Sequence, residues 1–472
     1  MTRWAAAGVA ILAVAIRIPG AVRDAFWQDE VSSAKVLVAH SPVSAIRQVA
    51  RVEATPPLWY ALGWLANAVG VRPEWYRGLS VLAGGLLAGA VVYLARRVLP
   101  LWASVAAGLL VAFGWQFVDH GRELRAYEFL ALLSVLFALA LASRHEWGLA
   151  VCVVAGALTN YFFLLSVLAG VIWLWTEPTV REARRRLTGV IAVSLVPLLV
   201  WSPVIVHQYR GHRFTWIGPF NMRRVLEAFW LLFVHKLPTA SYARESIPII
   251  LLGLVLAGAV VLWIGAPAGR LIALMALVPF VLESLAWLAG VRIFDTRNLI
   301  GAAPFAAVAL AALAARIPRP VSYAVAVAGV VLVTAGSIAA ESTPSIPYDR
   351  AAHTLVSDGW RPGDPIVVFG DFFAFRSPLE WYLPGRPKLT LAEPSANGTC
   401  AAIFLVAAGP ANQRLAYQRL AGGRKVGPLL VGRLRAHRPP AWPRARLLAA
   451  TSRRPGCAVL VPENRIVSRL RG

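Results

Sequence analysis

Charged residues are scarce in this chain of 472 residues: they make up 15% of it, whereas hydrophobic residues make up 58%. Soluble domains carry about 25% charged residues. The shortage excludes an ordinary soluble globular protein, and the mean hydropathy of +0.62 agrees with that exclusion. The composition therefore predicts an α-helical polytopic membrane protein.

Acidic residues and lysine are also few. The sequence holds 23 acidic residues against 47 basic ones, and only four of the basic residues are lysines. A net charge of +24 would favour nucleic acid in a soluble protein, but many of these arginines lie in short loops between apolar runs, where they set membrane orientation. We therefore expect membrane lipids as partners and no nucleic acid. The wealth of Ala, Gly, Val, Leu and Arg is typical of a bacterial chain from a GC-rich genome.

Cysteine is rare, with three residues, and none of them has metal-ligand spacing. Cys152 lies in an apolar run, whereas Cys400 and Cys457 lie in the polar C-terminal part. Two alternatives stay open for this pair, a disulfide if that part faces an oxidising compartment or two unpaired thiols. The sequence also lacks a P-loop, a GxGxxG segment after a strand and an HExxH segment. These absences speak against nucleotide-dependent chemistry, and we expect no cofactor and no metal.

Apolar runs fill the first 340 residues. They lie at about 4–18, 57–71, 79–95, 101–118, 127–143, 147–176, 188–206, 247–265, 271–289, 299–315 and 320–340. A helix that crosses a bilayer needs roughly 20 apolar residues. We interpret the short run at 57–71 as a juxtamembrane or partly re-entrant helix, and we divide the long run at 147–176 into two spans at Asn160 and Tyr161. The sequence thus predicts about eleven transmembrane helices, the first retained and not cleaved as a signal peptide.

The positive-inside rule supports this assignment. With the N-terminus inside, the inner loops hold eleven basic residues and three acidic ones. The basic residues are Arg3, Arg96, Arg97, Arg144, Arg181, Arg184, Arg185, Arg186, Arg270, Arg316 and Arg319. Counting 57–71 as a crossing would move all of them except Arg3 outside. A mixed scheme, in which 57–71 crosses and 147–176 crosses once, keeps 181–186 inside and stays open as an alternative.

The preferred scheme gathers most polar segments on the outer face. They are the loops at 19–78, 119–127, 160–163, 207–246 and 292–298, and everything after residue 340. We therefore expect a transmembrane domain over 1–340 and an extracytoplasmic domain over 341–472.

The C-terminal domain begins with a connector that we expect to extend from 341 to about 360. The pattern after it predicts strands at 364–370, 400–409, 427–434 and 457–461, with helices at 373–383 and 410–421. Strands that alternate with helices indicate a small α/β domain.

The first outer loop carries acids beside the membrane. Asp29 and Glu30 directly follow the first span, in what we expect to be an extended or turn segment, where adjacent carboxylates point to opposite sides. One of them is placed to act as a general base for an acceptor hydroxyl; the alternative is a solvated acidic loop. A third acid, Glu53, precedes Pro56 and Pro57, either of which is suited to open a helix.

Arginines gather at the predicted outer ends of later spans. Arg122 and Arg125 accompany Asp119, and Arg297 accompanies Asp295. Arginine binds phosphate through forked, charge-assisted hydrogen bonds, and a lipid phosphate lies at this depth. Each arginine alone is as well explained by a charge at a span end that reaches water, but three on the acid-bearing face favour a phosphate site.

Five segments of the first 315 residues resemble the motifs of one enzyme class. They are WQDEVSSA (27–34), EATPPLWY (53–60), YRGLSVLAGGLLAGAVVYLARR (76–97), HGRELRAYEFLALLSVLFALAL (120–141) and TRNLIGAAPFAAVAL (296–310). With them the chain resembles the GT-C class of membrane glycosyltransferases, within it the family 39 group of protein mannosyltransferases and bacterial aminoarabinose transferases. Thr55 departs from the pattern, since many relatives have His or another polar residue before the proline pair.

The resemblance implies a polyprenyl-phosphate sugar as donor and inverting transfer to an extracytoplasmic hydroxyl of a glycan, lipid or protein. It implies Asp29 as the catalytic base, with Glu30 and Glu53 in the acceptor or donor pocket. It further implies Arg122, Arg125 and Arg297 near the donor phosphate, and we expect Asp119, Tyr161 and Asp295 to line the same pocket.

Mannose is the first expectation for the sugar, with arabinose or a hexose analogue next. The expected location is the bacterial plasma membrane, with the active site and the C-terminal domain facing the cell envelope. One alternative is a transporter or flippase of polyprenyl-linked glycans, which would need ionisable groups along a path through the bilayer, whereas here they concentrate on one face. Another is a scaffold without catalysis, whose basic C-terminal domain binds an acidic wall polymer.

Overall fold

The chain folds into two compact units in a computed structural model. The structure describes residues 1–211, 217–234, 243–341, 345–361, 364, 366–369, 372–392, 404–408, 423–433 and 445–450. The first unit comprises Met1–Val22 and Ser33–Ser342, and the second comprises Arg23–Ser32 and Thr343–Gly472. The helix at Gln28–Leu37 therefore begins in the second unit and ends in the first.

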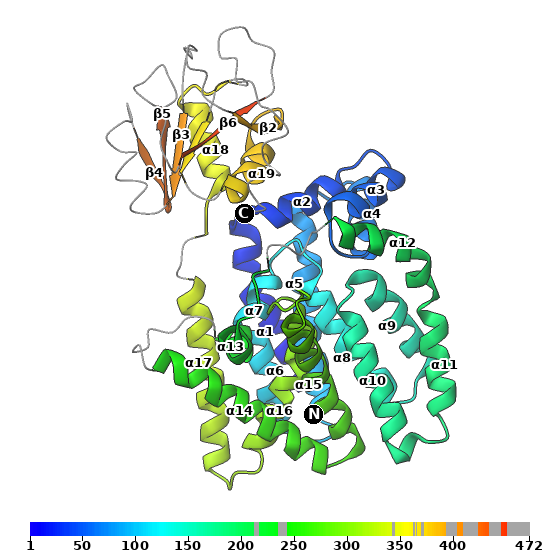
Figure 1. The fold of residues 1–472 in the computed structure, drawn as a ribbon. Coiled ribbons are helices and arrows are strands. Elements are labelled where there is room, and N and C mark those ends of the chain that lie inside the picture. Colours follow the sequence, from blue (N-terminus) through cyan, green and yellow to red (C-terminus); the bar gives the residue numbers. More distant parts are fainter. Residues whose placement is uncertain are drawn as a thin grey trace. The chain divides into compact units, whose positions relative to one another are not determined.

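The first unit is helical (Figure 1). Its helices are α1 (Thr2–Arg23), α2 (Gln28–Leu37), α3 (Pro42–Val52), α4 (Leu58–Ala68), α5 (Pro73–Ala95), α6 (Leu101–Phe113), α7 (Trp115–His120), α8 (Tyr127–Ala142), α9 (Glu146–Thr159), α10 (Phe163–Thr176), α11 (Arg184–Ser194), α12 (Val196–Arg210), α13 (Met222–Phe233), α14 (Ala243–Ile264), α15 (Pro267–Leu288), α16 (Ala303–Ala314) and α17 (Val321–Glu341). Short 3-10 helices, η1 (Pro178–Val180) and η2 (Asn298–Gly301), precede α11 and α16.

Five described helices are long and apolar enough to cross a membrane, namely α1, α5, α14, α15 and α17. The pair α11 and α12, bent by 46°, makes a sixth if it is one span, and α6, α8, α9, α10 and α16 are shorter apolar helices. The protein is therefore embedded in a membrane, and the total of about eleven crossings stays a prediction. The predicted break in the run at 147–176 is confirmed, because α9 ends at Thr159 and α10 begins at Phe163.

Small residues let the membrane helices approach closely. Gly85 and Gly89 of α5 lie against the backbone of α1 at Ala10 and Ala6. Gly258 of α14 lies against the backbone of α16 at Ala309. A Cβ at Gly258 would collide with the carbonyl of Ala309 and force the two helices apart, whereas at Gly85 and Gly89 it would lie 3.0 and 3.1 Å from a carbonyl oxygen, a tight contact.

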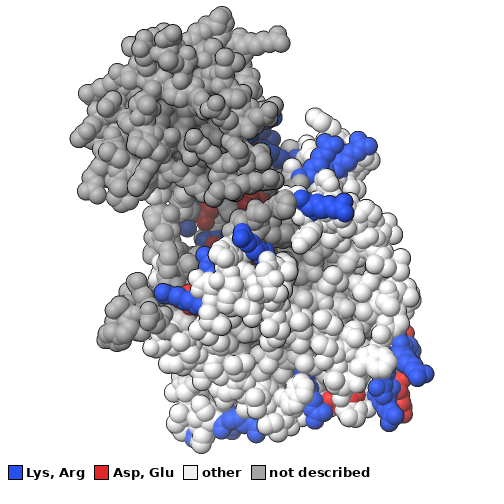
Figure 2. Space-filling model, in the orientation of Figure 1, with Lys and Arg blue, Asp and Glu red and all other residues white. Residues whose placement is uncertain are grey.

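Charged side chains gather at the two ends of the helical unit, and a broad uncharged band lies between them (Figure 2). One end is held by polar contacts between loops: Arg97 donates to Ser143, Arg144 to the carbonyl of Thr179, and Arg270 pairs with the buried Glu177 at 2.9 Å. The other end is formed by the C-terminus of α1 and the N-termini of α5 and α8. We call it the site end.

The second unit contains a six-stranded sheet in the order β2-β6-β1-β3-β5-β4. The strands are β1 (Ile366–Phe369), β2 (Leu389–Ala392), β3 (Phe404–Ala408), β4 (Arg424–Val426), β5 (Leu429–Arg433) and β6 (Ala445–Ala450). β1 pairs parallel with β3, and the other pairs are antiparallel. The helices α18 (Tyr348–Ser357) and α19 (Phe372–Tyr382) pack on a core that includes Ile366, Phe404 and Val431.

Two segments that we expected to be a connector and a loop contain helices. The connector expected at 341–360 contains α18, whose apolar side is buried in the core. The loop expected at 207–246 contains α13, a helix whose inner side is also buried. β1, β3 and β5 lie within predicted strands. The predicted helix at 410–421, the predicted strand at 457–461, and Cys400 with Cys457 lie outside the described residues.

We predict that Gly258→Ala lowers the unfolding temperature of the detergent-solubilised protein by several degrees. The added Cβ would meet the carbonyl of Ala309, and insertion into a packed interior costs about 1–3 kcal/mol. Gly253→Ala in the same helix is the control, because nothing lies within 4 Å of a Cβ there. Scanning fluorimetry checks the difference, and equal unfolding temperatures for the two variants would contradict it.

Candidate functional site

Asp29 and Glu30 lie in the first turn of α2, so the expectation of an extended or turn segment is wrong. The Glu30 carboxylate accepts a hydrogen bond from the backbone N–H of Trp27 at 3.4 Å. A glutamate at the third helical position that reaches back to the N–H of the capping residue is one half of a capping box. Glu30 is buried and caps the helix, whereas Asp29 is partly exposed.

Glu53 belongs to a polar network around Arg125. The Arg125 guanidinium pairs with the Glu53 carboxylate at 3.1 Å and donates to Ser33 Oγ at 3.1 Å and to Tyr60 Oη at 3.5 Å. The Tyr60 hydroxyl also lies 3.2 Å from Thr55 Oγ1. Burial and the nearby Glu53 carboxylate raise the pKa of Tyr60. These five residues form the acid–arginine network, which joins α2, the start of α4 and the turn before α8.

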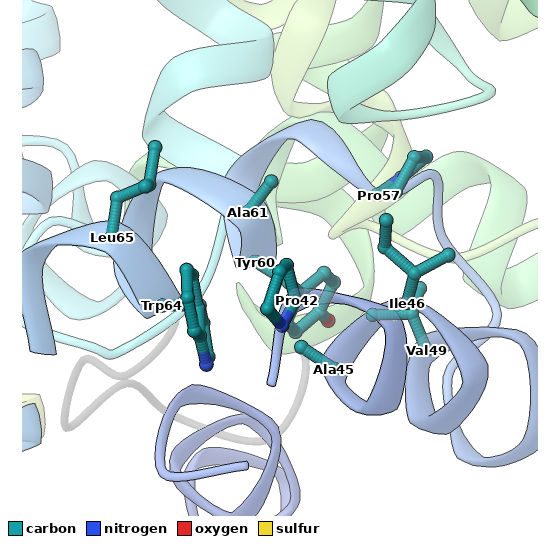
Figure 3. Close-up of a pocket in the computed structure, with 9 residues that line it drawn as sticks. All are labelled: Pro42, Ala45, Ile46, Val49, Pro57, Tyr60, Ala61, Trp64 and Leu65. Atoms are coloured by element: carbon teal, nitrogen blue, oxygen red, sulfur yellow. The ribbon is translucent and has the colours of Figure 1, made fainter. Parts of the chain in front are cut away.

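An apolar pocket of about 210 Å³ adjoins this network between α3 and α4 (Figure 3). Ile46 and Val49 line it from α3, and Tyr60 and Trp64 line it from α4. Tyr60 thus has its ring in the pocket and its hydroxyl in the acid–arginine network. α4 begins directly after Pro57, as expected for a helix opened by proline.

Two of the predicted phosphate arginines, Arg125 and Arg297, lie near His120 at the site end. Arg125, Arg297 and Asp295 all lie close enough to His120 to interact with it electrostatically. The residue before His120, Asp119, pairs with Arg122 at 3.0 Å. We call Asp119, His120, Arg122, Arg125, Asp295 and Arg297 the arginine cluster.

Carboxylates hold each of the three arginines. Asp119 pairs with Arg122 and Glu53 with Arg125, while Asp295 Oδ1 lies 3.8 Å from Arg297 Nε. The loop that carries Arg297 is fixed further, because Gln116 of α7 donates to Thr296 Oγ1 at 3.4 Å. The guanidinium groups are therefore oriented before any ligand binds.

His120 and Glu123 form a buried pair inside the cluster. His120 Nδ1 lies 2.9 Å from Glu123 Oε2, and its Nε2 has no hydrogen-bond partner among the described residues. Burial lowers the pKa of His120 to about 4. Burial, followed by the nearby Glu123, raises the pKa of Asp119. The imidazole is therefore neutral at pH 7.

Asp119, His120 and Glu123 are the described residues best placed to hold a metal, since one ligand atom from each lies within 4.8 Å of the others. All three side chains already have partners, because Asp119 pairs with Arg122 and Glu123 with His120. A cation would have to displace these contacts. The expectation of a site without metal stays a prediction.

Tyr161 lies in a second hydrogen-bond network, separate from the acid–arginine network. Its hydroxyl donates to Gln208 Oε1 at 2.8 Å and accepts a hydrogen bond from Trp201 Nε1 at 2.9 Å. Gln208 Nε2 in turn donates to the backbone carbonyl of Val49 at 3.2 Å. The network links the turn between α9 and α10 to the end of α3, next to Glu53. Burial raises the pKa of Tyr161 to about 12.

Sequence reasoning did not single out Ser33, Tyr60 or Glu123 for the site. Ser33 and Tyr60 lie inside WQDEVSSA and EATPPLWY, so the motifs themselves contain the missing contacts. Glu123 follows His120 by three residues, a spacing that brings two side chains of a helical turn together. That spacing is a signal that could have found the pair.

The fold is shared with solved structures of low sequence identity. The solved structures that share it include two of ArnT from Cupriavidus metallidurans. The apo crystal structure has a TM-score of 0.55 and 13% identity, covering 90% of this chain and 98% of that chain. The crystal structure bound to undecaprenyl phosphate has a TM-score of 0.52 and 14% identity, covering 90% of this chain and 97% of that chain. The sequence matches no protein-family profile and no curated protein.

We predict that Glu53→Gln destabilises the protein strongly. Arg125 and Glu53 are 11% and 5% exposed, and removing one charge from a buried pair costs up to about 3–5 kcal/mol. The control is Glu146→Gln, whose partner Arg186 is 63% exposed, because exposed pairs contribute about 0–1 kcal/mol. Unfolding temperatures measured side by side check this. If Glu146→Gln lowered the unfolding temperature as much as Glu53→Gln, the result would contradict the buried network.

Proposed function

We propose that the chain is an integral-membrane glycosyltransferase that moves a sugar from a polyprenyl-phosphate donor to an acceptor hydroxyl. The observation that carries the proposal is the meeting of Arg125 and Arg297 around His120, with Arg122 paired to the neighbouring Asp119. These arginines come from segments far apart in the sequence. They meet in a fold that ArnT also has, and ArnT has been crystallised with undecaprenyl phosphate.

The arginine cluster is the proposed phosphate site. The guanidinium group of arginine matches the oxygens of a phosphate. Asp119, Glu53 and Asp295 hold the three guanidinium groups in place. As the sugar leaves, negative charge grows on the phosphate, and fixed positive groups that stabilise it contribute a large part of catalysis. The same groups bind the donor and stabilise the transition state.

Asp29 is the proposed general base. It takes the proton of the acceptor hydroxyl while the hydroxyl oxygen attacks the anomeric carbon, and the bond from that carbon to phosphate oxygen breaks with its electron pair on polyprenyl phosphate. Inversion follows from attack on the opposite side. Support comes from α2: Asp29 and Ser33 are four residues apart, hence on one side of the helix, and Ser33 contacts Arg125.

A second cavity is suited to the polyprenyl chain. It measures about 370 Å³, lies among α6, α13, α14, α16 and α17, and has an apolar lining that includes Leu110 and Phe233. The ring of Phe233 lies 6.1 Å from that of Phe117 in α7, one helical turn before His120. A lipid chain in this cavity would thus have its phosphate end near the arginine cluster.

The finer assignments belong to the same proposal. Mannose is the first candidate for the sugar, the acceptor is a glycan, lipid or protein, and the site faces the outside of a bacterial plasma membrane. The alternative is a transporter or flippase of polyprenyl-linked glycans. Four ion pairs favour the enzyme, because two lie at the site end, Asp119–Arg122 and Glu53–Arg125, and two lie at the opposite end, Glu146–Arg186 and Glu177–Arg270.

We predict that Asp29→Asn abolishes sugar transfer, because the amide cannot accept the proton. The assay uses the purified protein in nanodiscs and measures sugar transfer from undecaprenyl-phosphate sugars to cell-envelope extract, the mannose form tried first. Glu74→Gln, an exposed acid at the start of α5, is the matched control and should retain full turnover. Turnover by the Asp29 variant equal to wild type would remove it as the base.

We predict that Arg297→Gln weakens binding of undecaprenyl phosphate at least tenfold, since a charge-assisted contact to phosphate is lost and a neutral amide replaces it. Arg72→Gln, an exposed arginine before α5, should bind like wild type. Binding is measured by microscale thermophoresis at fixed ionic strength. Equal affinities for the two variants would place the phosphate away from the arginine cluster.

A further inference from the structure

We infer that α19 and the core of the second unit hold residues 24–27 of that same unit, and that Tyr382 of α19 is a positioning residue for Asp29. This inference rests on the proposed role of Asp29 as the base. It gives the C-terminal domain a task in the reaction that neither the sequence pattern nor the shared fold assigns.

The anchor centres on Phe26, three residues before Asp29. The backbone N–H of Phe26 donates to the hydroxyl of Tyr382 at 2.6 Å. The ring of Phe26 is 1% exposed and lies 6.1 Å from the ring of Trp381. The guanidinium of Arg386 lies 3.7 Å from the centre of the Trp381 ring and supports it from within the same unit.

Residues on both sides of Phe26 are held as well. Ala25 and Trp27 pack against the hydrophobic core of the second unit. Asp24 accepts a hydrogen bond from Ser345 Oγ at 3.1 Å. Four consecutive residues, 24–27, therefore contact parts of the chain more than 300 positions away.

The fixed segment determines where α2 starts. Trp27 is the capping residue whose N–H bonds to Glu30, so the helix begins at the end of the anchor. Asp29 is the second residue of this helix. A catalytic base must lie within hydrogen-bond reach of the proton it takes, and small misplacements of reacting groups cost large factors in rate. Loosening the anchor therefore lowers the rate of the chemical step and leaves the binding of the lipid phosphate in place.

The principal test is Tyr382→Phe, which removes the hydroxyl that accepts the Phe26 N–H and keeps the ring. In nanodiscs, with undecaprenyl-phosphate mannose as first donor probe, we expect kcat to fall at least tenfold while KM for the donor stays within twofold. Hydrogen exchange of the peptide covering 24–32 should become faster. Tyr93→Phe, which changes an exposed tyrosine of α5, is the matched control and should change neither quantity.

Ser345→Ala tests the anchor without touching the buried core. It removes the contact to Asp24 and should lower kcat two- to threefold with an unchanged unfolding temperature. Unchanged kcat in both anchor variants, or a higher KM at constant kcat, would overturn the inference. So would unchanged exchange of residues 24–32 in Tyr382→Phe, a readout that needs no substrate.

The inference and the proposed function fail in different ways. If Asp29→Asn is inactive and the anchor variants keep the wild-type kcat, the base stands and the anchor is refuted. If Asp29→Asn retains wild-type turnover, the proposed function of this carboxylate fails, whatever hydrogen exchange reports on the anchor.

Discussion

The hydrocarbon core of the bilayer is the constraint on which the rest of this structure depends. Ionisable groups in that layer cost several kcal/mol unless they are paired, and the charged side chains on the visible surface of the helical unit lie mainly at its two ends (Figure 2). At one end, Arg97, Arg144 and Arg270 join loops. At the other, the arginines meet carboxylates in pairs. Because opposite charges gather at the membrane surface, few residues are needed to form a site for a lipid phosphate.

Much of the helical unit follows from the sequence because apolar length is a direct physical requirement for a span. The break at Asn160 and Tyr161 could be predicted from the sequence, because two polar side chains interrupt an apolar run that is too long for one span. α13 and α18 were missed because they are only 12 and 10 residues long, too short for a span, and charged residues interrupt their apolar pattern. β2 and β6 are short, and their pairing is set by partners distant in the sequence.

The sequence indicates the charged residues of the candidate site but not the contacts between them. Arg122, Arg125 and Arg297 stand out as basic residues at span ends next to acids, which is a local signal. That Arg125 contacts Glu53 and Ser33 depends on how distant segments pack, and no local pattern encodes this. The pair of Arg122 with Asp119 is local, because the two residues are three positions apart. Glu30 shows the same limit, since its use in capping α2 becomes visible only when the segment is known to be helical.

The central claim is that one lipid phosphate binds at the arginine cluster with Asp29 beside the sugar. Cryo-electron microscopy of the protein in nanodiscs with undecaprenyl phosphate tests it most directly. The account predicts phosphate density within hydrogen-bond distance of Arg122, Arg125 and Arg297, with the Asp29 carboxylate facing the space next to it. Phosphate density at the opposite end of the helices, or an Asp29 carboxylate tens of ångströms from the phosphate, would contradict it.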